Sequence, residues 1–443
     1  MKKIGMVSLG CPKNLVDTEG LLGDLKQNGY ELTDNSAEAD VLIVNTCGFL
    51  QSAVEESVNT ILEMARHKQN GGRCERLIVT GCLAERHPDE LLKEIPEIDH
   101  LLGTKQYPLL KNLIRNNGGQ RNLIHEPAQY FEAYNNRVVT TPFYSAYIKI
   151  AEGCSNQCAF CIIPKLRGPI KSRPVDSILE EARALAEQGV KEINLVSQDT
   201  TLYGYDLRMK NGLVELLEKL SDIEGIEWIR LFYCYPTVVN DALIDAVARL
   251  DKVVKYIDVP LQHTHDVMLQ SMKRQEREAG VRAMLKKLRD RIPGVALRTT
   301  FITGFPGETQ EHFEHMEAFV REMEFDHLGV FAYSDEPGTT AYDHAGKVDP
   351  AIGEERRDRL MAVQHDIAVR NNAARVGQVH PVLVEGLDDE GMLLMGRLPI
   401  QGPDIDGQVI IENSPVEPGE IVPMRITGSL DYDLVATVDD NTD

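Results

Sequence analysis

The stretch GCSNQCAFCIIP, residues 153–164, decides how the rest of the chain is interpreted. It holds three cysteines at CxxxCxxC spacing and follows an apolar run at 144–150 that predicts a β-strand. Loops after the strands of a β/α barrel lie at the carboxyl end, where active sites are built. Three thiolates on one short loop can bind three irons of a 4Fe–4S cluster and leave the fourth iron open. We therefore predict such a cluster at Cys154, Cys158 and Cys161.

Zinc is the alternative metal for these three cysteines. A structural zinc site normally has a fourth Cys or His ligand, usually within paired CxxC units. No histidine lies near residues 153–164, and the motif ends in two isoleucines and a proline. The pattern therefore favours the iron–sulfur cluster.

A series of strands and helices surrounds this loop. Apolar runs predict six strands, and helical periodicity predicts the helices between them. The strands are expected at 144–150, 191–197, 226–232, 253–259, 295–302 and 326–333, and the helices at 175–189, 211–221, 238–250, 266–290 and 308–323. This series resembles a TIM-type barrel short of two units, a partial (β/α)6 barrel. A longer helix at 351–375 closes the predicted domain.

Two further domains are expected. Apolar runs at 3–9, 41–45 and 77–80 alternate with helical patterns at 15–28, 50–67 and 89–94, which predicts an open parallel α/β domain. From Gly377 about five short alternating runs predict a small antiparallel β-barrel of OB-like type. The predicted boundaries are 1–118 for the N-terminal domain, 119–139 for a polar linker, 140–372 for the partial barrel and 373–443 for the β-barrel.

A second set of cysteines follows the strands of the N-terminal domain. Cys11, Cys47 and Cys82 end the runs VSLGC, IVNTC and IVTGC, about 35 residues apart, each beside a glycine. Carboxyl ends of parallel strands share one edge of an open sheet, where ligands bind. These thiols are therefore predicted to hold a second cluster; the alternative is three buried core thiols. Cys74 and Cys234 lack this placement and are interpreted as non-ligands.

Composition excludes several classes of protein. The 443 residues carry a net charge of −22, with 42% hydrophobic and 26% charged residues, which is a globular balance. No apolar run reaches the roughly 18–20 residues of a membrane span. The apolar start at 4–9 is shorter than the about 7–15 residues of a signal peptide core, so a cytoplasmic protein is expected. A disulfide framework is not expected for the eight cysteines of such a chain.

The two cysteine sets and the β-rich tail together resemble the radical S-adenosylmethionine (SAM) methylthiotransferases, over essentially the whole chain. CxxxCxxC with an aromatic residue before the third cysteine is the radical SAM signature, and the tail resembles a TRAM domain. Within the family the chain resembles the branch that modifies an aspartate of ribosomal protein S-twelve. The stretches that carry the resemblance are SLGCPKNLVD (8–17), NTCGFLQSAVEES (45–57), GCLAER (81–86), GCSNQCAFCIIP (153–164), RTTFITGFPGET (298–309) and GPDIDG (402–407).

The resemblance implies a methylthiotransferase with two 4Fe–4S clusters and SAM. The N-terminal cluster would carry the sulfur to be donated, and one SAM would methylate it. A second SAM, at the Cys154 cluster, would yield a 5′-deoxyadenosyl radical that takes hydrogen from the β-carbon of the aspartate. A cofactor suits this step, because ordinary side chains cannot deprotonate an unactivated C–H bond.

Five residues are candidates for binding SAM. The resemblance places Phe160 near the adenine and the loop with Gly304 and Gly307 in the SAM pocket. Gln198, after the second barrel strand, and Arg298, in the fifth, could line the pocket by position. The alternatives are core packing for Phe160, a plain strand-to-helix turn for the glycines and hydrogen bonding within the barrel mouth for the other two. His263 and His265 are interpreted as structural or substrate-lining.

The tail favours a protein substrate. Residues 373–443 contain 14 acidic residues, three arginines and no lysine. Such a surface repels RNA and attracts a basic ribosomal protein, although the same charge could serve solubility alone. The alternatives are a tRNA adenosine methylthiotransferase and a noncatalytic iron–sulfur scaffold or redox sensor. The expected partners are ribosomal protein S-twelve and an electron donor such as flavodoxin or ferredoxin; neither a membrane nor nucleic acid as direct substrate is expected.

Overall fold

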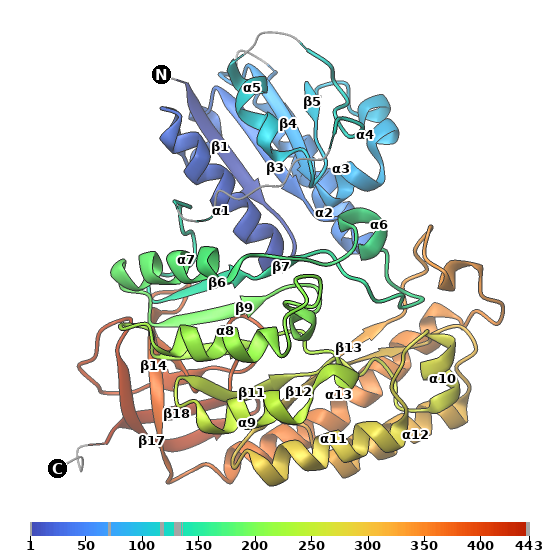
Figure 1. Cartoon of the computed structure of the whole chain (residues 1–443), viewed down its shortest axis with the longest axis vertical. Coiled ribbons are helices and arrows are strands. Elements are labelled where there is room, and N and C mark those ends of the chain that lie inside the picture. Colours follow the sequence, from blue (N-terminus) through green and yellow to red (C-terminus); the bar gives the residue numbers. More distant parts are fainter. Residues whose placement is uncertain (1, 70–71, 116–118, 128–133, 135, 440–443) are drawn as a thin grey trace. The chain divides into compact units, whose positions relative to one another are not determined.

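The computed structural model describes residues 2–69, 72–115, 119–127, 134 and 136–439 (Figure 1). It divides into two compact units. The first contains Met1–Thr140, Glu152–Asn156 and Cys161–Lys171, and the second contains Thr141–Ala151, Gln157–Phe160 and Ser172–Asp443. The CxxxCxxC loop therefore contributes to both units. The predicted boundary at 118 and part of the predicted linker 119–139 lie outside the described residues.

The first unit is built on a parallel sheet with strand order β2-β1-β3-β4-β5. The three central strands, β1 (Lys3–Ser8), β3 (Val41–Thr46) and β4 (Arg76–Gly81), confirm the predicted runs. The edge strands β2 (Glu31–Thr33) and β5 (His100–Leu101) were not predicted, because two or three residues are too few for a recognisable pattern. The helices are α1 (Pro12–Gln27), α2 (Gln51–Arg66), α3 (Cys82–Arg86), α4 (Pro88–Glu94) and α5 (Leu110–Arg115).

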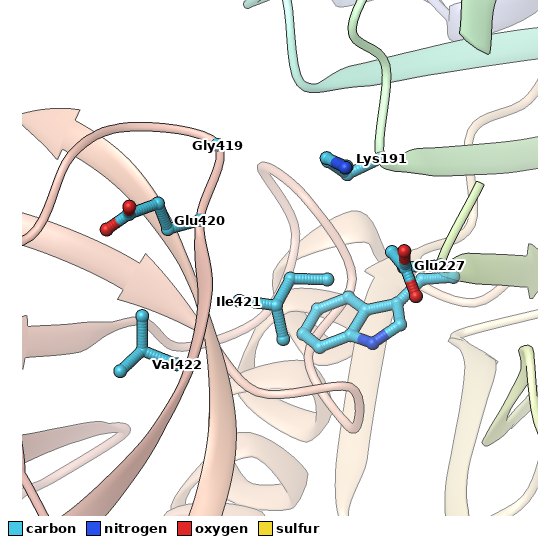
Figure 2. A pocket seen from close by; sticks show the side chains of 7 residues that line it. Lys191, Glu227, Gly419, Glu420, Ile421 and Val422 are labelled. Atoms are coloured by element: carbon cyan, nitrogen blue, oxygen red, sulfur yellow. The ribbon is translucent and has the colours of Figure 1, made fainter. Parts of the chain in front are cut away.

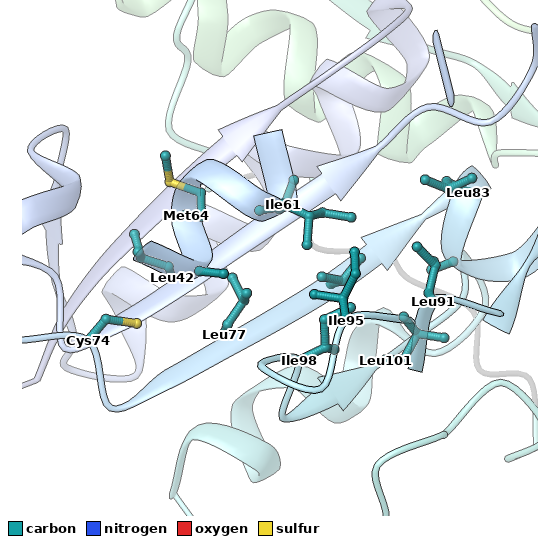
Figure 3. Packing of buried hydrophobic residues seen from close by; sticks show 14 of the residues in the cluster. Leu42, Ile61, Met64, Cys74, Leu77, Leu83, Leu91, Ile95, Ile98 and Leu101 are labelled. Carbon is teal, nitrogen blue, oxygen red and sulfur yellow. The ribbon is translucent and has the colours of Figure 1, made fainter. Parts of the chain in front are cut away.

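The core of this unit lies between β3, β4 and the helices that cover them. Leu42, Leu77 and Ile98 are among its fully buried members, and Ile61 of α2 packs over the sheet (Figure 3). Complete burial of one such side chain contributes roughly 1.5–3 kcal/mol. This apolar face fixes the register of the strands, and with it the positions of the loops at their carboxyl ends.

The second unit contains a six-stranded sheet with order β13-β12-β11-β10-β9-β6, parallel throughout. Its strands confirm the six that were predicted: β6 (Ser145–Lys149), β9 (Glu192–Val196), β10 (Trp228–Leu231), β11 (Val253–Asp258), β12 (Ala296–Thr303) and β13 (His327–Ala332). The connecting helices are α7 (Val175–Glu187), α8 (Gly212–Ser221), α9 (Asp241–Arg249), α10 (Asp266–Ser271), α11 (Glu278–Arg291) and α12 (Gln310–Met323), followed by α13 (Pro350–Ala373). Three short elements flank the cysteine loop in sequence: β7 (Ala151–Glu152), α6 (Ile163–Arg167) and β8 (Lys171–Ser172). Short 3-10 helices cover Ser36–Glu38, Tyr107–Leu109, Thr200–Leu202, Pro236–Val238 and Ala341–Asp343.

The single helix predicted at 266–290 is wrong, because the structure has two helices there, α10 and α11. Lys273 has a φ of +56°, which is incompatible with a continuous right-handed helix. The break turns the next residue, Arg274, inward, where it donates to the Pro260 carbonyl and pairs with Glu276. An arginine needs such partners when it is buried, and a helix through this segment would not supply them.

The C-terminal strands form a closed barrel in the order β14-β15-β16-β18-β17. They are β14 (Val379–Leu387), β15 (Leu394–Arg397), β16 (Val409–Ile411), β17 (Ile421–Leu430) and β18 (Asp433–Val438). The number of strands is as predicted, but β16 and β18 pair in parallel, which departs from the expected antiparallel arrangement. A closed ring of five strands cannot alternate in direction all the way round, so one neighbouring pair must run the same way.

A buried ion-pair network joins this barrel to the six-stranded sheet within the second unit. Glu192 of β9 pairs with Arg397 of β15 at 2.6 Å and with Arg230 of β10 at 2.9 Å, and all three side chains are at most 1% exposed. Burial alone would raise the pKa of Glu192, but the two arginines outweigh it and hold that pKa well below its usual range. The network therefore contains a permanently ionised carboxylate at neutral pH.

Candidate functional site

The first cysteine set lies where three neighbouring parallel strands end. Cys11 caps the start of α1 after β1, Cys47 follows β3, and Cys82 is the first residue of α3 after β4. Gly10, with a φ of +87°, packs so closely that an added Cβ would lie 2.8 Å from the Cys47 sulfur. Ser57 of α2 is fully buried; it accepts a hydrogen bond from the Cys47 N–H at 3.1 Å and donates to the Cys47 carbonyl at 2.8 Å. The predicted convergence of the strand ends is therefore present.

The three thiols of this set influence one another electrostatically. Burial raises the pKa of Cys82 to about 11, and Cys11 and Cys47 add to the rise. Burial also raises the pKa of Cys47, with a further contribution from Cys11. The pKa of Cys11 is lowered, because Lys13, Arg167 and backbone N–H groups outweigh its burial. Thiols that lie this close to one another and to cations can lose their protons when a positively charged metal group binds.

Arg167 is a site residue that the sequence did not reveal. It ends α6, six positions after Cys161, and its side chain is about 1% exposed. Both Nε and Nη2 lie 3.4 Å from the Cys82 sulfur, while Nη1 donates to Asp17 at 3.1 Å and to Glu152 at 2.9 Å. No sequence pattern near Arg167 shows that α6 packs against a cysteine from the first sheet.

Asn14 extends this arrangement to the other strand ends. Its side-chain oxygen accepts from Arg167 Nη2 at 3.1 Å, and its amide donates to the carbonyl of Leu9 at 2.8 Å and of Asn45 at 3.3 Å. The carbonyls belong to the segments that lead into Cys11 and Cys47. One buried network therefore reaches the backbone just before Cys11 and Cys47 and the sulfur of Cys82.

Three cysteines at adjacent strand ends have the chemistry of ligands to an iron–sulfur cube. Among the described residues, no group of three or more Cys, His, Asp or Glu is placed to hold one metal ion. In a cube each thiolate binds its own iron, so the sulfurs stand around a larger group instead of one centre. All eight cysteines are free thiols. The assignment of six of them as ligands stays a prediction.

The second cysteine set lies on the loop between β7 and α6. In the first unit, the Cys154 N–H donates to the Gly168 carbonyl at 3.0 Å. In the second unit, Arg274 Nη1 lies 3.6 Å from the Cys158 sulfur, and its guanidinium carbon lies 4.1 Å from the centre of the Tyr235 ring. Arg274 was not predicted as a site residue either.

The predicted SAM-pocket residues have firm structural roles of their own. Phe160 packs against a buried apolar cluster that includes Phe305 and Met272. Gly304, with a φ of +71°, lies against α13, where an added Cβ would come 2.8 Å from the Gly353 Cα. The N–H of Gly307 donates to the Gly346 carbonyl at 2.8 Å. These contacts support the simpler interpretation, a packed strand-to-helix turn, without testing SAM binding.

Two other candidates lie on or just after the barrel strands, Gln198 beyond the carboxyl end of β9 and Arg298 in the amino-terminal half of β12. Gln198 is half-buried just after β9. Arg298 of β12 pairs with Asp258 at 3.2 Å and with Asp406 at 3.4 Å, so its charge is already balanced by two carboxylates. A role for either residue in binding SAM stays a prediction.

His263 has a structural environment. It is 1% exposed, its Nε2 lies 3.4 Å from the Glu308 carboxylate, and its Nδ1 accepts from the Thr264 N–H at 2.8 Å. Burial lowers the pKa of His263. A neutral imidazole that fixes its own loop agrees with the structural half of the prediction.

A groove of about 580 Å³ lies at the opposite edge of the six-stranded sheet. Lys191 and Glu227 line it from the amino ends of β9 and β10, and Ile421, the first residue of β17, points toward them (Figure 2). Ligands of parallel sheets bind at the carboxyl ends. We therefore interpret this groove as part of the junction between the sheet and the C-terminal barrel.

Three family models match successive parts of the chain. The uncharacterized protein family UPF0004 matches residues 3–103, the radical SAM superfamily matches 148–320 and the TRAM domain matches 376–438. In the described part of the chain, no helix has the length and apolar character needed to cross a membrane.

Curated relatives match the whole chain. Proteins named ribosomal protein uS12 methylthiotransferase RimO are 49% identical in Anaeromyxobacter sp. (strain Fw109-5), 46% in Acetivibrio thermocellus and 46% in Geobacter sulfurreducens. The alignments cover 98%, 99% and 99% of this chain and 93%, 98% and 98% of the relatives.

Solved structures share the fold at low identity. The radical S-adenosylmethionine methyltransferase TsrM from Kitasatospora setae matches with a TM-score of 0.57 and 13% identity, covering 85% of this chain and 91% of that chain. The cobalamin-dependent S-adenosylmethionine radical enzyme OxsB matches with a TM-score of 0.54 and 13% identity, covering 83% of this chain and 56% of that chain. Both similarities concern the fold alone.

Proposed function

Because this chain belongs to the RimO family of ribosomal protein uS12 methylthiotransferases, we propose that it adds a methylthio group to the β-carbon of an aspartate in ribosomal protein uS12. The observation that carries the proposal is 46–49% identity to RimO proteins over 98–99% of the chain. The chain is a radical SAM methylthiotransferase, and the resemblance seen in the sequence is confirmed.

The two cysteine sets would hold the inorganic cofactors. Cys11, Cys47 and Cys82 fit one 4Fe–4S cluster by their placement at three adjacent strand ends, and the CxxxCxxC loop fits the other. When bound, the clusters and SAM supply the methylated sulfur and the radical that breaks an unactivated C–H bond. The protein itself binds, orients and shields these groups.

Two features of the first unit support such a role. Ser57 fixes the backbone of Cys47, and Asn14 holds the carbonyls of Leu9 and Asn45, two residues before Cys11 and Cys47, which limits the movement of these two sulfurs. Cys82 also packs against Ile162, Leu166 and Phe49, and this apolar contact excludes water from its sulfur. The geometry is therefore rigid and partly dry before any substrate binds.

The charge of the C-terminal barrel supports a basic protein substrate. Each of the three arginines in residues 373–443 is paired with acid: Arg397 with Glu192, Arg375 with Asp326 and Arg425 with Asp439. Acidic residues therefore dominate the surface of this barrel. An acidic surface speeds encounter with a cationic protein and slows encounter with RNA.

The proposed reaction also needs an electron donor and a cellular compartment. An electron donor such as flavodoxin or ferredoxin would supply the reducing electron, since no side chain of the chain can do so. Because bacterial small ribosomal subunits are cytoplasmic, we place the reaction in the cytoplasm.

The test uses anaerobically reconstituted full-length protein with SAM, a strong reductant and either uS12 or tRNA. We expect 5′-deoxyadenosine to form and uS12 to gain the mass of a methylthio group in place of hydrogen. Modified tRNA with unchanged uS12 would overturn the substrate, and absence of 5′-deoxyadenosine would favour the noncatalytic scaffold. A Cys11→Ala/Cys47→Ala/Cys82→Ala variant should retain one cube where the wild type has two.

A further inference from the structure

Each cysteine set has a buried arginine that points at one of its sulfurs. In the first unit Arg167 approaches Cys82 with two nitrogens, each 3.4 Å from the sulfur. In the second unit Arg274 approaches Cys158 with one nitrogen, 3.6 Å away. The Arg167 side chain is about 1% exposed and that of Arg274 4%. Burying a guanidinium is costly, so its position next to a sulfur needs a reason.

Carboxylates balance both charges but do not account for the contacts with sulfur. Arg167 reaches Asp17 and Glu152 through Nη1, while Nε is directed at Cys82 and Nη2 lies between Cys82 and the Asn14 side-chain oxygen. Arg274 pairs with Glu276 through Nε and donates to the Pro260 carbonyl through Nη2, which leaves Nη1 for Cys158. In both cases the rigid fork of the guanidinium is oriented by other groups so that a remaining N–H meets the sulfur.

We propose that Arg167 and Arg274 are positioning residues that donate hydrogen bonds to ligand sulfurs of the two iron–sulfur clusters, and that each arginine raises the reduction potential of its own cluster. An added electron makes the cluster more negative, and a nearby cation with an N–H···S contact stabilises that reduced form. An arginine is always charged, so its effect does not depend on pH. The two clusters are therefore tuned separately, each by a residue of the unit that contains the contact.

Arg167 has a second consequence for the first unit. It lies on α6, directly after the CxxxCxxC motif, yet it binds the cysteine that follows β4. Through Asn14 it also reaches the carbonyl groups before Cys11 and Cys47. Assembly of the N-terminal cluster is thereby linked to the correct placement of the segment that follows Cys161.

The inference rests on the two clusters of the proposed function, but its test does not involve uS12. Full-length protein is reconstituted anaerobically in two backgrounds that each retain one cluster: the Cys154→Ala/Cys158→Ala/Cys161→Ala variant and the Cys11→Ala/Cys47→Ala/Cys82→Ala variant. Midpoint potentials are measured by redox titration monitored by electron paramagnetic resonance. Iron quantitation on the parent backgrounds comes first, and a background without its cube would overturn the cluster assignment instead of the arginine roles.

The variants Arg167→Gln and Arg274→Gln serve as each other's controls. We expect Arg167→Gln to lower the midpoint potential of the N-terminal cluster and leave that of the CxxxCxxC cluster unchanged, with the reverse for Arg274→Gln. An unchanged potential at the arginine's own cluster, or equal shifts at both clusters, would overturn the proposal.

If the Arg→Gln variants fail to assemble their iron–sulfur cluster, Arg→Lys variants at the same positions still test the proposal. Circular dichroism of the apoprotein establishes whether the variant folds. Where Arg167→Gln folds but loses its cube, Arg167→Lys should restore iron content because it retains the charge, and its potential should lie below that of the parent because a lysine lacks the fork. Failure of lysine to restore the cube of a folded protein would contradict the electrostatic role.

Discussion

At the scale of single residues, Arg167 shows how the first unit tolerates a charge in its interior. The side chains of Arg167 and Asp17 are each about 1% exposed, and the atoms that join them lie 3.1 Å apart. A buried pair adds little net stability compared with apolar residues, but removal of one partner leaves the other charge less well compensated. The carboxylate of Asp17 therefore helps to balance the buried charge of Arg167.

Asp17→Asn should lower the free energy of unfolding of the apoprotein by about 1–3 kcal/mol, since it removes one of the two carboxylates that balance Arg167 and leaves Glu152 as the other. The measurement is denaturant unfolding followed by circular dichroism. The control is Lys219→Gln, which breaks the half-exposed pair with Glu215 and should cost much less, because surface ion pairs add little to stability. Similar losses in both variants would show that Asp17 does not compensate Arg167.

Gly10→Ala tests the close packing at Cys47. An added Cβ would lie 2.7 Å from the Cys47 Cβ and 2.8 Å from its sulfur, so the cysteine must move. We expect the variant to bind less iron at the N-terminal cluster, measured by iron and sulfide quantitation in the background that lacks the CxxxCxxC cysteines.

The control for this variant is Gly29→Ala in the same unit. Gly29 has a φ of +83°, close to the +87° of Gly10, but nothing lies within 4 Å of an added Cβ. Both variants carry the same backbone strain, of about 1–2 kcal/mol. Equal iron content in the two would therefore show that contact with Cys47 does not matter for cluster assembly.

At the scale of elements, the turn after β12 holds α13 in place. Gly304→Ala would bring a Cβ to 2.8 Å from the Gly353 Cα in this helix, in addition to the strain at a φ of +71°. We expect a loss of more than the about 1–3 kcal/mol that the backbone alone would cost. Thermal unfolding measures the loss. The control is Gly294→Ala, which measures the backbone strain alone, because Gly294 has a φ of +72° and nothing lies within 4 Å of an added Cβ. A loss no larger than that of the control would contradict the packing role.

The elements also show what the sequence can predict. Long apolar strands such as β3 and β12 were recognisable because every residue, or every second one, faces a core. The break between α10 and α11 was not recognisable in the sequence. It depends on the contacts of Arg274 with the Pro260 carbonyl and with Glu276, which form only when the chain has folded. The parallel pair in the C-terminal barrel follows from closure of five strands, which is a property of the ring and of no single strand.

The same distinction applies to the site. All three cysteines of the first set could be placed at one sheet edge, because parallel strands impose that edge on whatever follows them. Arg167 could not be placed at this edge from the sequence. Its partner Cys82 lies 85 positions away, and no sequence pattern at either residue indicates the contact. Contacts between distant segments depend on how helices and strands pack together. From a single sequence, apolar periodicity predicts which face of an element is buried, but not which residues it contacts.

At the scale of the whole molecule, charge is distributed unevenly. The net charge of −22 is compatible with burial of several arginines, because each of these is matched by acid inside the fold. Consequently, the acidic residues at the surface of the C-terminal barrel have few cations to offset them. Solubility alone does not require this distribution, whereas recognition of a basic protein does benefit from it.

Glu192 joins the six-stranded sheet to the C-terminal barrel. Its pKa lies well below the usual range because Arg397 and Arg230 outweigh its burial. A carboxylate whose pKa is depressed by folding stabilises the protein at every pH above its unfolded pKa of about 4.3, and this contribution is lost as the pH falls below that value. Glu192→Gln should therefore cost about 3–5 kcal/mol at pH 7, and the difference from wild type should shrink progressively below about pH 4. Thermal unfolding from pH 7 down to pH 3 measures both, and a difference that stayed constant across this range would mean that the glutamine acts through packing instead of charge.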